Sequence, residues 1–513
     1  MTAREGAYTP PPEVYRAGSA TYGRLFRESA SLNSERTALI EGARSRSYAE
    51  LNERSDRMAR VLLDRGLDRG DRVGLLTRNC IEFVEVELAA AKIGVISVNL
   101  NWRQTPAEFA HCVCLTAPSF IVSGEEFVAP LKDAGWETDL VIGRGYDAAL
   151  DAVDPADLPT VYVEGEDGLC ILFTSGTTGM PKGALISHRA MVARALIFAT
   201  ETGAPKDDTF IAWSPLFHMG SNDFTLATLL RGGQIVIIDG YDADKMIDAI
   251  EEYAVHYVTV VPGMIEDFIT RLKVRDAKPK PIGLIGAMAD LVPRPLLKEI
   301  TTLLNAPYFN TFGSTETGNP PASASLIPVG EAPESLSKKQ NDFCEIRLVD
   351  ADGNDVVDGE PGELAIRGPS VFSGYWGNDA ANQEAFRGGW FHMGDVFRRN
   401  EDGSLDFVDR VKYMIKSGGE NIYPAEIEQH IMGDERILDV AVVRKSHEKW
   451  GEVPVVFAAR SDHALTPEDV IGMCRGRIAN YKLPKEVHFI EMDDLPRSTS
   501  GKIQRHILEE RLR

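Results

Sequence analysis

The sequence predicts an α/β protein with a large N-terminal domain of parallel β-sheets, a small antiparallel β subdomain and a C-terminal α+β domain. Three observations support this prediction. The chain has 513 residues, more than one hydrophobic core usually serves. Helix and strand patterns alternate up to about residue 340, which is typical of sheets whose faces are covered by helices. Beyond that residue the pattern changes to short paired strands.

The first helices are marked by their capping residues. Ser47 and Glu50 have the spacing of a capping box, which predicts a helix starting at residue 48. Thr105 and Glu108 form a second such box, with Pro106 at the first helical position.

Buried strands are expected between the helices. Residues 71–76 and 95–99 read as strands around a helix over 81–93, which Gly94 ends. Further along, the same scheme predicts strands over 234–238 and 257–261 and a helix over 243–253.

The pattern in the last third of the chain predicts an architecture that differs from the alternating helices and strands before it. Residues 345–350 and 363–367 read as antiparallel strands with a tight turn at Asp352-Gly353. The final hundred or so residues predict helices over 425–432 and 467–479 and strands over 440–444 and 454–459. We therefore expect an N-terminal domain over 1–409 and a C-terminal domain over 410–513.

Composition excludes several classes of partner. Asp and Glu number 77 against 55 Lys and Arg, a formal charge of −22 that argues against binding nucleic acid or anionic membranes. The six cysteines lack metal-site spacing, so we expect buried thiols in a reducing compartment. The N-terminus lacks a signal-peptide core, and no apolar run reaches the roughly 18 residues of a transmembrane helix. The sequence therefore predicts a cytoplasmic protein.

One segment between two apolar strands has the composition of a ligand-binding loop. Residues 169–173 and 183–187 read as strands, and Thr174 to Lys182 between them offers hydroxyls, bare backbone N–H groups and one cation. Glycines let backbone amides approach a ligand closely, and this combination suits a polyphosphate. The segment matches neither a Walker A loop nor G-x-G-x-x-G. A flexible surface hairpin is the alternative.

The segment TSGTTGMPKG resembles the phosphate-loop signature of the adenylate-forming superfamily, which includes acyl-CoA synthetases, peptide-synthetase adenylation domains and luciferases. Residues 310–316 resemble the family's Y-G-x-T-E segment, with Phe312 in place of tyrosine. Residues 389–395 resemble its W-x-x-T-G-D, with Met393 in place of threonine. Similar segments follow in the family's order at 409–428, the hinge and the loop beyond it, and at 495–502, the C-terminal lysine motif.

The resemblance implies an AMP-forming acid–thiol ligase that uses ATP, Mg²⁺ and coenzyme A. A carboxylate would attack the α-phosphate of ATP, and a thiol would then displace AMP. It implies catalytic roles for Lys502, Glu316 and Thr315, with Glu316 also holding Mg²⁺. The residues implied to bind ATP are Thr174, Ser175, Gly176, Thr177, Thr178, Gly179, Lys182, Phe312, Asp395 and Arg410.

The resemblance also implies a mobile C-terminal domain. Lys412 aligns with the hinge about which this domain would rotate between the half-reactions. Rotation would remove Lys502 and bring in the thiol side, for which Ser417, Gly418, Gly419 and Lys416 are the candidates. An ordinary turn and a solvated lysine are the alternatives for this last group.

The acid and its acceptor are less determined. Met219 replaces the aspartate that binds the α-ammonium in amino-acid-activating members, which disfavours amino acids. The acyl pocket implied by the resemblance comprises His218, Met219, Gly220, Gly286 and Met288. Asn222 or Asp223 would suit a polar acid if turned inward, but a helix face pointing away explains them equally well.

Four functions remain open from sequence. The expected function is an acyl-CoA synthetase acting on a carboxylic acid whose chain length and aromatic or aliphatic character the sequence leaves open. Its rivals are an acyl-AMP ligase that loads a separate carrier protein, a luciferase-like oxygenase and a non-catalytic nucleotide-binding regulator. CoA is favoured because the chain ends eleven residues after Lys502 without a carrier domain. The oligomeric state is open, with a homodimer among the options.

Overall fold

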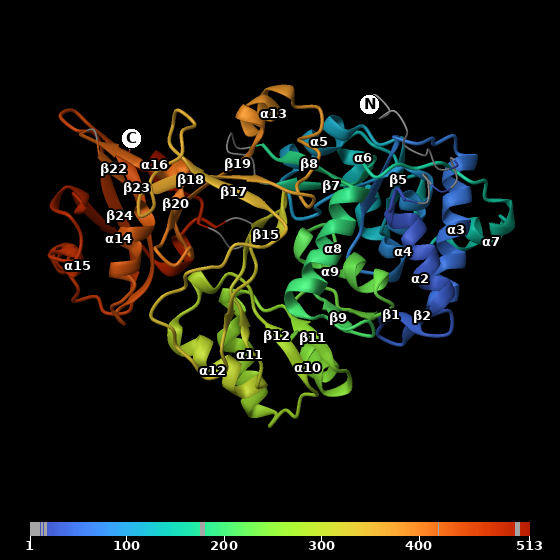
Figure 1. Cartoon of the computed structure of the whole chain (residues 1–513), viewed down its shortest axis with the longest axis horizontal. Helices are drawn as coiled ribbons and strands as arrows, with labels where there is room; N and C mark the ends of the chain where they lie inside the picture. Colours follow the sequence, from blue (N-terminus) through green and yellow to red (C-terminus); the bar gives the residue numbers. More distant parts are fainter. Residues whose placement is uncertain are drawn as a thin grey trace, which may run out of the picture. The chain divides into compact units, whose positions relative to one another are not determined.

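The structure is a computed structural model that describes residues 11, 14, 18–174, 180–418, 420–497 and 503–512. Its contacts divide the chain into two compact units (Figure 1). The larger unit comprises Met1–Glu345 with Arg367–Glu384, and the smaller comprises Ile346–Ile366 with Ala385–Arg513.

Two mainly parallel sheets organise the larger unit. The first has the strand order β6-β5-β3-β4-β7-β8 and the second β16-β13-β12-β11-β9-β10-β1-β2. The strands of the first sheet are β3 (Arg72–Leu76), β4 (Ile96–Asn99), β5 (Phe120–Ser123), β6 (Leu140–Val141), β7 (Gly168–Thr174) and β8 (Lys182–Ser187). Those of the second are β1 (Thr37–Glu41), β2 (Arg44–Ser47), β9 (Thr209–Ala212), β10 (Gln234–Ile237), β11 (Val255–Val258), β12 (Ile282–Ile285), β13 (Tyr308–Phe309) and β16 (Leu326–Ile327).

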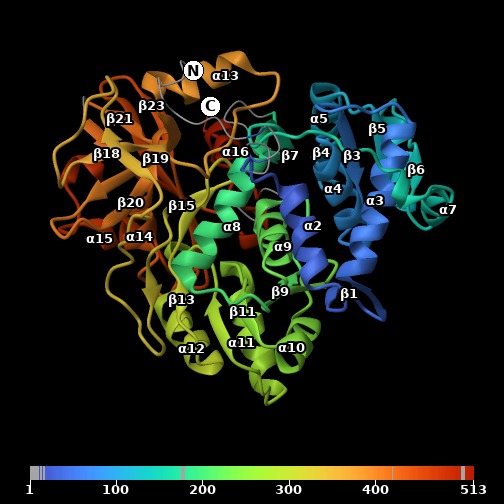
Figure 2. The ribbon, with the colours of Figure 1, turned by 45° about the vertical axis from the view of Figure 1, so that its right-hand side comes forward.

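Helices cover and separate these sheets, and Figures 1 and 2 both show α2, α8 and α9 packed beside one another. A separate hairpin joins β14 (Phe312–Ser314) to β15 (Gly318–Ala322). The helices are α2 (Tyr22–Leu32), α3 (Tyr48–Asp64), α4 (Ile81–Ile93), α5 (Pro106–Thr116), α6 (Val128–Asp133), α7 (Tyr146–Asp151), α8 (His188–Thr202), α9 (Met219–Leu230), α10 (Ala243–Glu252), α11 (Ile265–Val274), α12 (Arg294–Leu304) and α13 (Asp379–Ala385), which crosses the unit boundary.

The smaller unit contains two sheets of its own. One is the antiparallel sheet β17-β18-β19-β20, and the other has the order β22-β21-β24-β23 with β25 paired to β24. Their strands are β17 (Glu345–Val349), β18 (Pro361–Arg367), β19 (Phe391–Arg399), β20 (Leu405–Arg410), β21 (Ile415–Ser417), β22 (Glu420–Ile422), β23 (Ile437–His447), β24 (Gly451–Arg460) and β25 (Glu486–Phe489). The helices are α14 (Pro424–Ile431), α15 (Pro467–Cys474) and α16 (Arg505–Glu510).

The expected fold class is confirmed, and so are both capping boxes and the end of α4 at Gly94. Two predicted ends are wrong. The strand predicted over 257–261 is β11, which ends at Val258 because the Thr259 carbonyl accepts from the Trp213 indole and Pro262 starts a 3-10 turn. The helix predicted over 467–479 is α15, which ends at Cys474, since Arg475 is extended and Gly476 has a φ of +73°.

In the antiparallel subdomain the two predicted strands and the turn at Asp352-Gly353 are present, and β17 lies next to β18 in the sheet. Between the turn and β18, Asp355 pairs with Val349, and β18 begins at Pro361. Among the cysteines, all are free thiols and five are buried, but Cys114 is exposed on α5. Within the described ranges, every helix is too short or too polar to cross a membrane.

Helix α4 is buried on every side because it contacts β3, β4 and β7 of one sheet and β1 of the other. Four charged side chains on it therefore need partners inside the protein. Glu82 pairs with Arg44, Glu85 with Arg46 and Arg54, Glu87 with Asn222, and Lys92 with Asp56. Burial raises the pKa of Glu87 to about 7 and lowers that of Lys92 to about 7.

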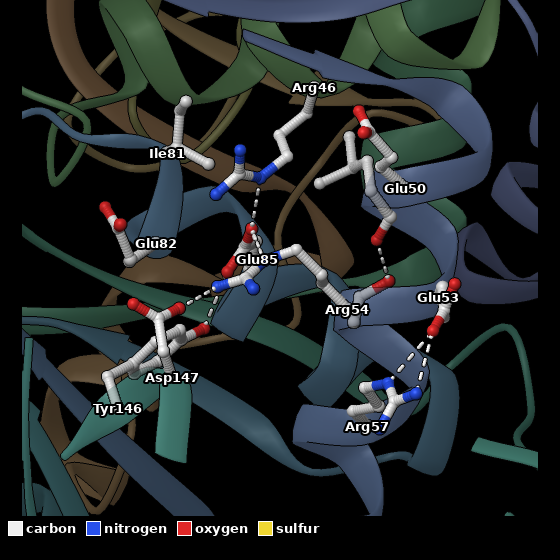
Figure 3. A network of polar contacts seen from close by, with 12 residues as sticks. Arg46, Glu50, Glu53, Arg54, Arg57, Ile81, Glu82, Glu85, Tyr146 and Asp147 are labelled. Atoms are coloured by element: carbon white, nitrogen blue, oxygen red, sulfur yellow. Dashed lines mark hydrogen bonds and ion pairs between the residues drawn. The ribbon is translucent and has the colours of Figure 1, made fainter. Parts of the chain in front are cut away.

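The partners of Glu85 come from three different elements (Figure 3). The Arg54 Nε donates to Glu85 Oε1 at 2.5 Å, and the Tyr146 hydroxyl donates to Oε2 at 3.0 Å. Arg54 also reaches Asp147 at 2.7 Å. This network fixes α4 against α3 and α7.

We predict that Arg54→Met lowers the free energy of unfolding by about 3 kcal/mol, because it leaves the buried Glu85 carboxylate without its main cation. Arg60→Met, on the exposed face of the same helix, should cost less than about 1 kcal/mol, since its pair with Asp64 is solvated. Chemical denaturation of the three proteins measures the difference. Equal losses from both substitutions would contradict the role given to Glu85.

Candidate active site

The predicted phosphate segment closes a hairpin at the edge of the first sheet. Strands β7 and β8 pair antiparallel, and their register sets Thr174 opposite Lys182, so the two ends of the segment meet. The five candidates between them, Ser175, Gly176, Thr177, Thr178 and Gly179, lie outside the described residues.

Lys182 is half-buried, and its ammonium lies 4.8 Å from the centre of the Tyr375 ring. Tyr375 belongs to a short segment that adds to β8: Trp376 N donates to Gly183 O at 2.8 Å, and Leu185 N to Gly374 O at 2.9 Å. The Tyr375 hydroxyl donates to Glu316 Oε1 at 2.9 Å. One aromatic side chain thus joins the predicted phosphate cation to the predicted metal carboxylate.

The Thr315–Glu316 turn connects β14 to β15 and is held through its backbone. The Thr315 carbonyl accepts from Arg194 Nη2 at 3.0 Å, and the Glu316 carbonyl accepts from Phe372 N at 2.8 Å. Arg194 lies on α8 with its side chain only 3% exposed, and its charge is balanced by Asp223 at 3.0 Å. A third bond runs from Arg194 Nε to the Ser370 carbonyl at 3.1 Å.

Sequence reasoning missed both Arg194 and Tyr375. A single arginine within the apolar run Ala190–Phe198 was the available signal for the first. The second follows Gly374 and precedes Trp376, an aromatic pair after a glycine whose φ of +112° turns the chain. Neither pattern identifies the partner, because both partners are distant in sequence.

Phe312, the predicted adenine contact, is half-buried in β14 opposite Ala322. The next residue must be glycine, because a Cβ on Gly313 would lie 1.9 Å from the Gly318 carbonyl oxygen. This close approach of the two strands fixes the place of Phe312 and of the turn that follows it.

The residues around Glu316 fit a magnesium ion bound to a nucleotide. Within the described part of the chain, no three His, Cys, Asp or Glu side chains gather as a metal-binding group. Mg²⁺ bound with ATP needs no such group, since one or two carboxylates, waters and phosphates complete its shell. Tyr375 engages one oxygen of Glu316, and among the described residues the other accepts no hydrogen bond. This second carboxylate oxygen can serve as the protein ligand that such a magnesium ion requires.

The predicted acyl-side residues lie on α9 and on the segment after β12. His218 is exposed and caps α9: its Nδ1 accepts from Gly220 N at 3.1 Å. Met219 and Gly220 are half-buried beside it. Asn79 fixes the loop before His218, because its amide nitrogen donates to the Ser214 carbonyl at 2.8 Å and its oxygen accepts from Leu216 N at 2.8 Å.

Asn222 and Asp223 lie inside the protein and have charged partners there. Asn222 is fully buried and donates to both Glu87 oxygens, at 2.8 and 2.9 Å, while Asp223 pairs with Arg194. These buried partners explain both polar residues without a polar substrate.

Two tyrosines fix the backbone near Gly286. The Tyr257 hydroxyl donates to the Gly286 carbonyl at 2.9 Å, and the Tyr308 hydroxyl donates to the Ala287 carbonyl at 2.7 Å. Gly286 has a φ of +78°, and a Cβ there would lie 2.0 Å from the Tyr308 ring. Met288 follows with its side chain 36% exposed.

The smaller unit holds the remaining candidates. Asp395 on β19 and Arg410 on β20 are cross-strand partners, with Arg410 Nε 2.9 Å from Asp395 Oδ1. Asp395 is 1% exposed, whereas the Arg410 side chain is 39% exposed. The buried Asp395 carboxylate pairs with the partly exposed Arg410 guanidinium. A carboxylate accepts hydrogen bonds, so it suits a ligand that donates hydroxyl groups.

Lys412 lies in the 3-10 turn Val411–Tyr413 between β20 and β21, with its ammonium 4.8 Å from the centre of the Tyr413 ring. The Arg505 guanidinium lies 4.4 Å from the same ring and donates twice to Glu428, at 2.7 and 2.8 Å. Arg505 begins α16, the helix that follows the lysine motif. Lys502 itself lies outside the described residues, and its neighbours Arg497 and Ile503 pair as a β-bridge.

The buried Asp409 joins β20 to α14. Its two oxygens accept from Arg410 N at 2.7 Å and from Ala425 N at 2.8 Å. Burial raises the pKa of this carboxyl to about 6. The carboxylate thus fixes both sides of the segment that contains Lys412.

The predicted CoA-side residues form the β21–β22 hairpin. Lys416 is exposed and its N–H donates to Glu452 Oε2 at 2.8 Å, while Ser417 is buried. Gly418 has a φ of +61° and donates to the Trp450 carbonyl at 2.8 Å. A Cβ on Gly418 would lie 2.8 Å from the Trp450 ring, which sequence reasoning did not include. Gly419 lies outside the described residues.

Comparisons with known proteins show the family to which the chain belongs. The sequence matches the model of the AMP-binding enzyme family over residues 26–376 and that of the AMP-binding enzyme C-terminal domain over 426–502. It is 34% identical to the indoleacetate–CoA ligase of Aromatoleum aromaticum, over 93% of this chain and 95% of that protein. It is 33% identical to the feruloyl-CoA synthase of an Amycolatopsis species, over 92% and 95%.

Solved structures show the same fold. The o-succinylbenzoate CoA synthetase of Bacillus subtilis, in complex with its acyl-adenylate intermediate, superposes with a TM-score of 0.82 at 27% identity over 94% of this chain and 97% of that chain. A Mycobacterium tuberculosis fatty acyl CoA synthetase gives a TM-score of 0.77 at 28% identity over 96% and 98%. The chain belongs to the AMP-binding enzyme family and is, like these relatives, an AMP-forming acid–CoA ligase.

Proposed function

We propose that the chain activates an aromatic carboxylic acid as its adenylate and then transfers the acyl group to coenzyme A. The observation that carries this proposal is the convergence of Lys182 and Glu316 on Tyr375. A cation for phosphate oxygens lies 4.8 Å from the centre of the Tyr375 ring, and a carboxylate for a divalent ion accepts a hydrogen bond from the hydroxyl of the same residue. Attack of a carboxylate on a triphosphate needs both, since it brings one anion against another.

In the first half-reaction the acid's carboxylate oxygen attacks the α-phosphorus of ATP, and pyrophosphate leaves. The loop from Thr174 through Ser175, Gly176, Thr177, Thr178 and Gly179 to Lys182 would hold the β- and γ-phosphates. Thr315 would contact the α-phosphate, Phe312 the adenine, and Asp395 with Arg410 the ribose. Glu316 would hold Mg²⁺, which screens phosphate charge.

Lys502 would bridge the carboxylate and the α-phosphate during this step. We propose that residues 410–513 then turn about Lys412 as a mobile domain, which removes Lys502 from the reacting atoms. In the second half-reaction the CoA sulfur attacks the acyl carbon, its proton passes to solvent and AMP leaves. Ser417, Gly418, Gly419 and Lys416 would line the path of the thiol, with Trp450 packed against that hairpin.

Three relatives act on acids that contain an aromatic ring, as their names indoleacetate–CoA ligase, feruloyl-CoA synthase and 2-succinylbenzoate–CoA ligase state. The residues proposed to border the acyl group suit such a ring. Met219 and Met288 offer thioethers, which pack well against aromatic rings. His218 would lie at the entrance of the pocket for the acyl group.

Because the six cysteines are free thiols, we propose the reducing cytoplasm as the compartment.

We predict that pyrophosphate release is at least tenfold more efficient, in kcat/KM, with aryl acids than with aliphatic acids of equal carbon number. The panel pairs indoleacetate, ferulate and benzoate with saturated acids, each with and without CoA. AMP release that requires CoA supports the proposed acceptor. A preference for aliphatic acids would contradict the acid class, and AMP release only with a carrier protein would contradict the acceptor.

We also predict that Lys502→Ala lowers the rate of adenylate formation by about 100-fold or more, the usual cost of removing one preorganised donor from a charged transition state. Conversion of preformed acyl-adenylate to thioester should change less than about threefold. Lys485→Ala is the matched control, an exposed lysine of the same unit. Single-turnover assays of each half-reaction test this, and equal losses in both would refute the separate role of Lys502.

A further inference from the structure

Tyr375 stands between two oppositely charged groups of the proposed site. We propose that it is a positioning residue, which orients the Glu316 carboxylate for the metal of MgATP and holds the Lys182 ammonium for the phosphates. The inference rests on the function proposed above and adds to it a residue that the sequence analysis did not select.

The hydroxyl of Tyr375 acts on Glu316. A phenol O–H donates one hydrogen bond, and here it goes to Oε1 of Glu316 at 2.9 Å. A carboxylate that ligates a metal through one oxygen is commonly oriented by a hydrogen bond to the other, and losing such a partner costs about 10- to 100-fold in metal affinity. The bond therefore turns Oε2 toward the ligand without neutralising the carboxylate.

The ring of Tyr375 acts on Lys182. The ammonium lies 4.8 Å from the ring centre, within the range of a cation–π interaction. No described carboxylate forms an ion pair with Lys182. If Lys182 and Glu316 paired directly, each would neutralise the other. Because each contacts a neutral aromatic residue instead, neither charge is compensated by the other, and both can act on ATP and its metal.

Tyr375 is itself firmly held. Its N–H donates to Asn382 Oδ1 at 2.7 Å, and its carbonyl accepts from Asn382 Nδ2 at 2.9 Å. Its ring packs edge-on against Phe372 at 4.9 Å, and Phe372 N donates to the Glu316 carbonyl at 2.8 Å. One short segment thus fixes the backbone and the side chain of Glu316 together, which is what a preorganised metal ligand needs.

Two variants separate the hydroxyl from the ring. Tyr375→Phe removes the hydroxyl and with it the bond to Glu316, whereas Tyr375→Leu also removes the aromatic ring that the Lys182 ammonium contacts. Tyr253→Phe is the control, since it deletes a tyrosine–carboxylate bond of 2.7 Å to Glu252 on α10. The measured quantity is the dissociation constant of α,β-methylene-ATP, determined by calorimetry with Mg²⁺ and with EDTA on the full chain.

We expect Tyr375→Phe to reduce the gain in affinity that Mg²⁺ provides by about tenfold, while binding without metal changes less than about twofold. Tyr375→Leu should show the same loss and a further weakening of about two- to fivefold without metal. In a Glu316→Gln background, Tyr375→Phe should have no additional effect on the Mg²⁺ gain. Tyr253→Phe should match the parent protein.

The proposal is overturned if Tyr375→Phe weakens binding equally with and without Mg²⁺, or if its effect adds fully to that of Glu316→Gln. Either result would mean a general structural role. The Tyr375→Phe ring keeps the contact with Phe372, and melting temperatures within about 3 °C of the parent would exclude misfolding as the cause. A parent protein without any affinity for the magnesium nucleotide would overturn the proposed function itself.

Discussion

The Arg194 guanidinium is the interaction on which the proposed site depends. It donates to Asp223 on α9, to the Thr315 carbonyl and to the Ser370 carbonyl, and its side chain is almost completely buried. A buried cation with one charged partner and two carbonyl acceptors is satisfied only when all three are in place. Helix α9, the Thr315–Glu316 turn and the segment that leads to Tyr375 are therefore fixed by one side chain.

This arrangement links the two sides of the proposed reaction. The N-cap His218 and the first helical residues Met219 and Gly220 of α9 are assigned to the acid. The nearby Asn222 and Asp223 on the same helix pair with charged groups inside the protein. The turn held by Arg194 contains Thr315 and Glu316, which we assign to the nucleotide. Because Asp223 and Arg194 tie one to the other, the acid side and the ATP side of the larger unit share one rigid support.

The predictable part of the fold came from local signals. Capping boxes at Ser47 and Thr105 and the stop at Gly94 mark helix ends because each acts within one turn of chain. The same local patterns also predicted strands β7 and β8, which pair with each other. They did not show that α4 is buried on every side, since its pattern of charges reads as a partly exposed helix. Only the packing of two sheets around it explains where Glu85 and Glu87 find partners.

The unpredicted part of the site depends on contacts between distant segments. Tyr375 and Glu316 are 59 positions apart, and Arg194 and Thr315 are 121 apart. No periodicity or spacing connects such pairs, so sequence could select Glu316 and Thr315 through a resemblance but not the groups that orient them. Asn222 and Asp223 illustrate the converse: they were considered for the substrate, yet they balance buried charges that the sequence alone does not reveal.

In the proposed site, Lys182 receives the phosphates of MgATP and Glu316 receives its metal. A crystal structure with Mn²⁺ and α,β-methylene-ATP is the decisive measurement, because Mn²⁺ replaces Mg²⁺ and its anomalous scattering locates the metal. We expect the manganese peak at coordination distance from the Glu316 carboxylate and the terminal phosphates within hydrogen-bonding reach of the Lys182 ammonium. A manganese peak bound elsewhere, or phosphates far from Lys182, would contradict this assignment.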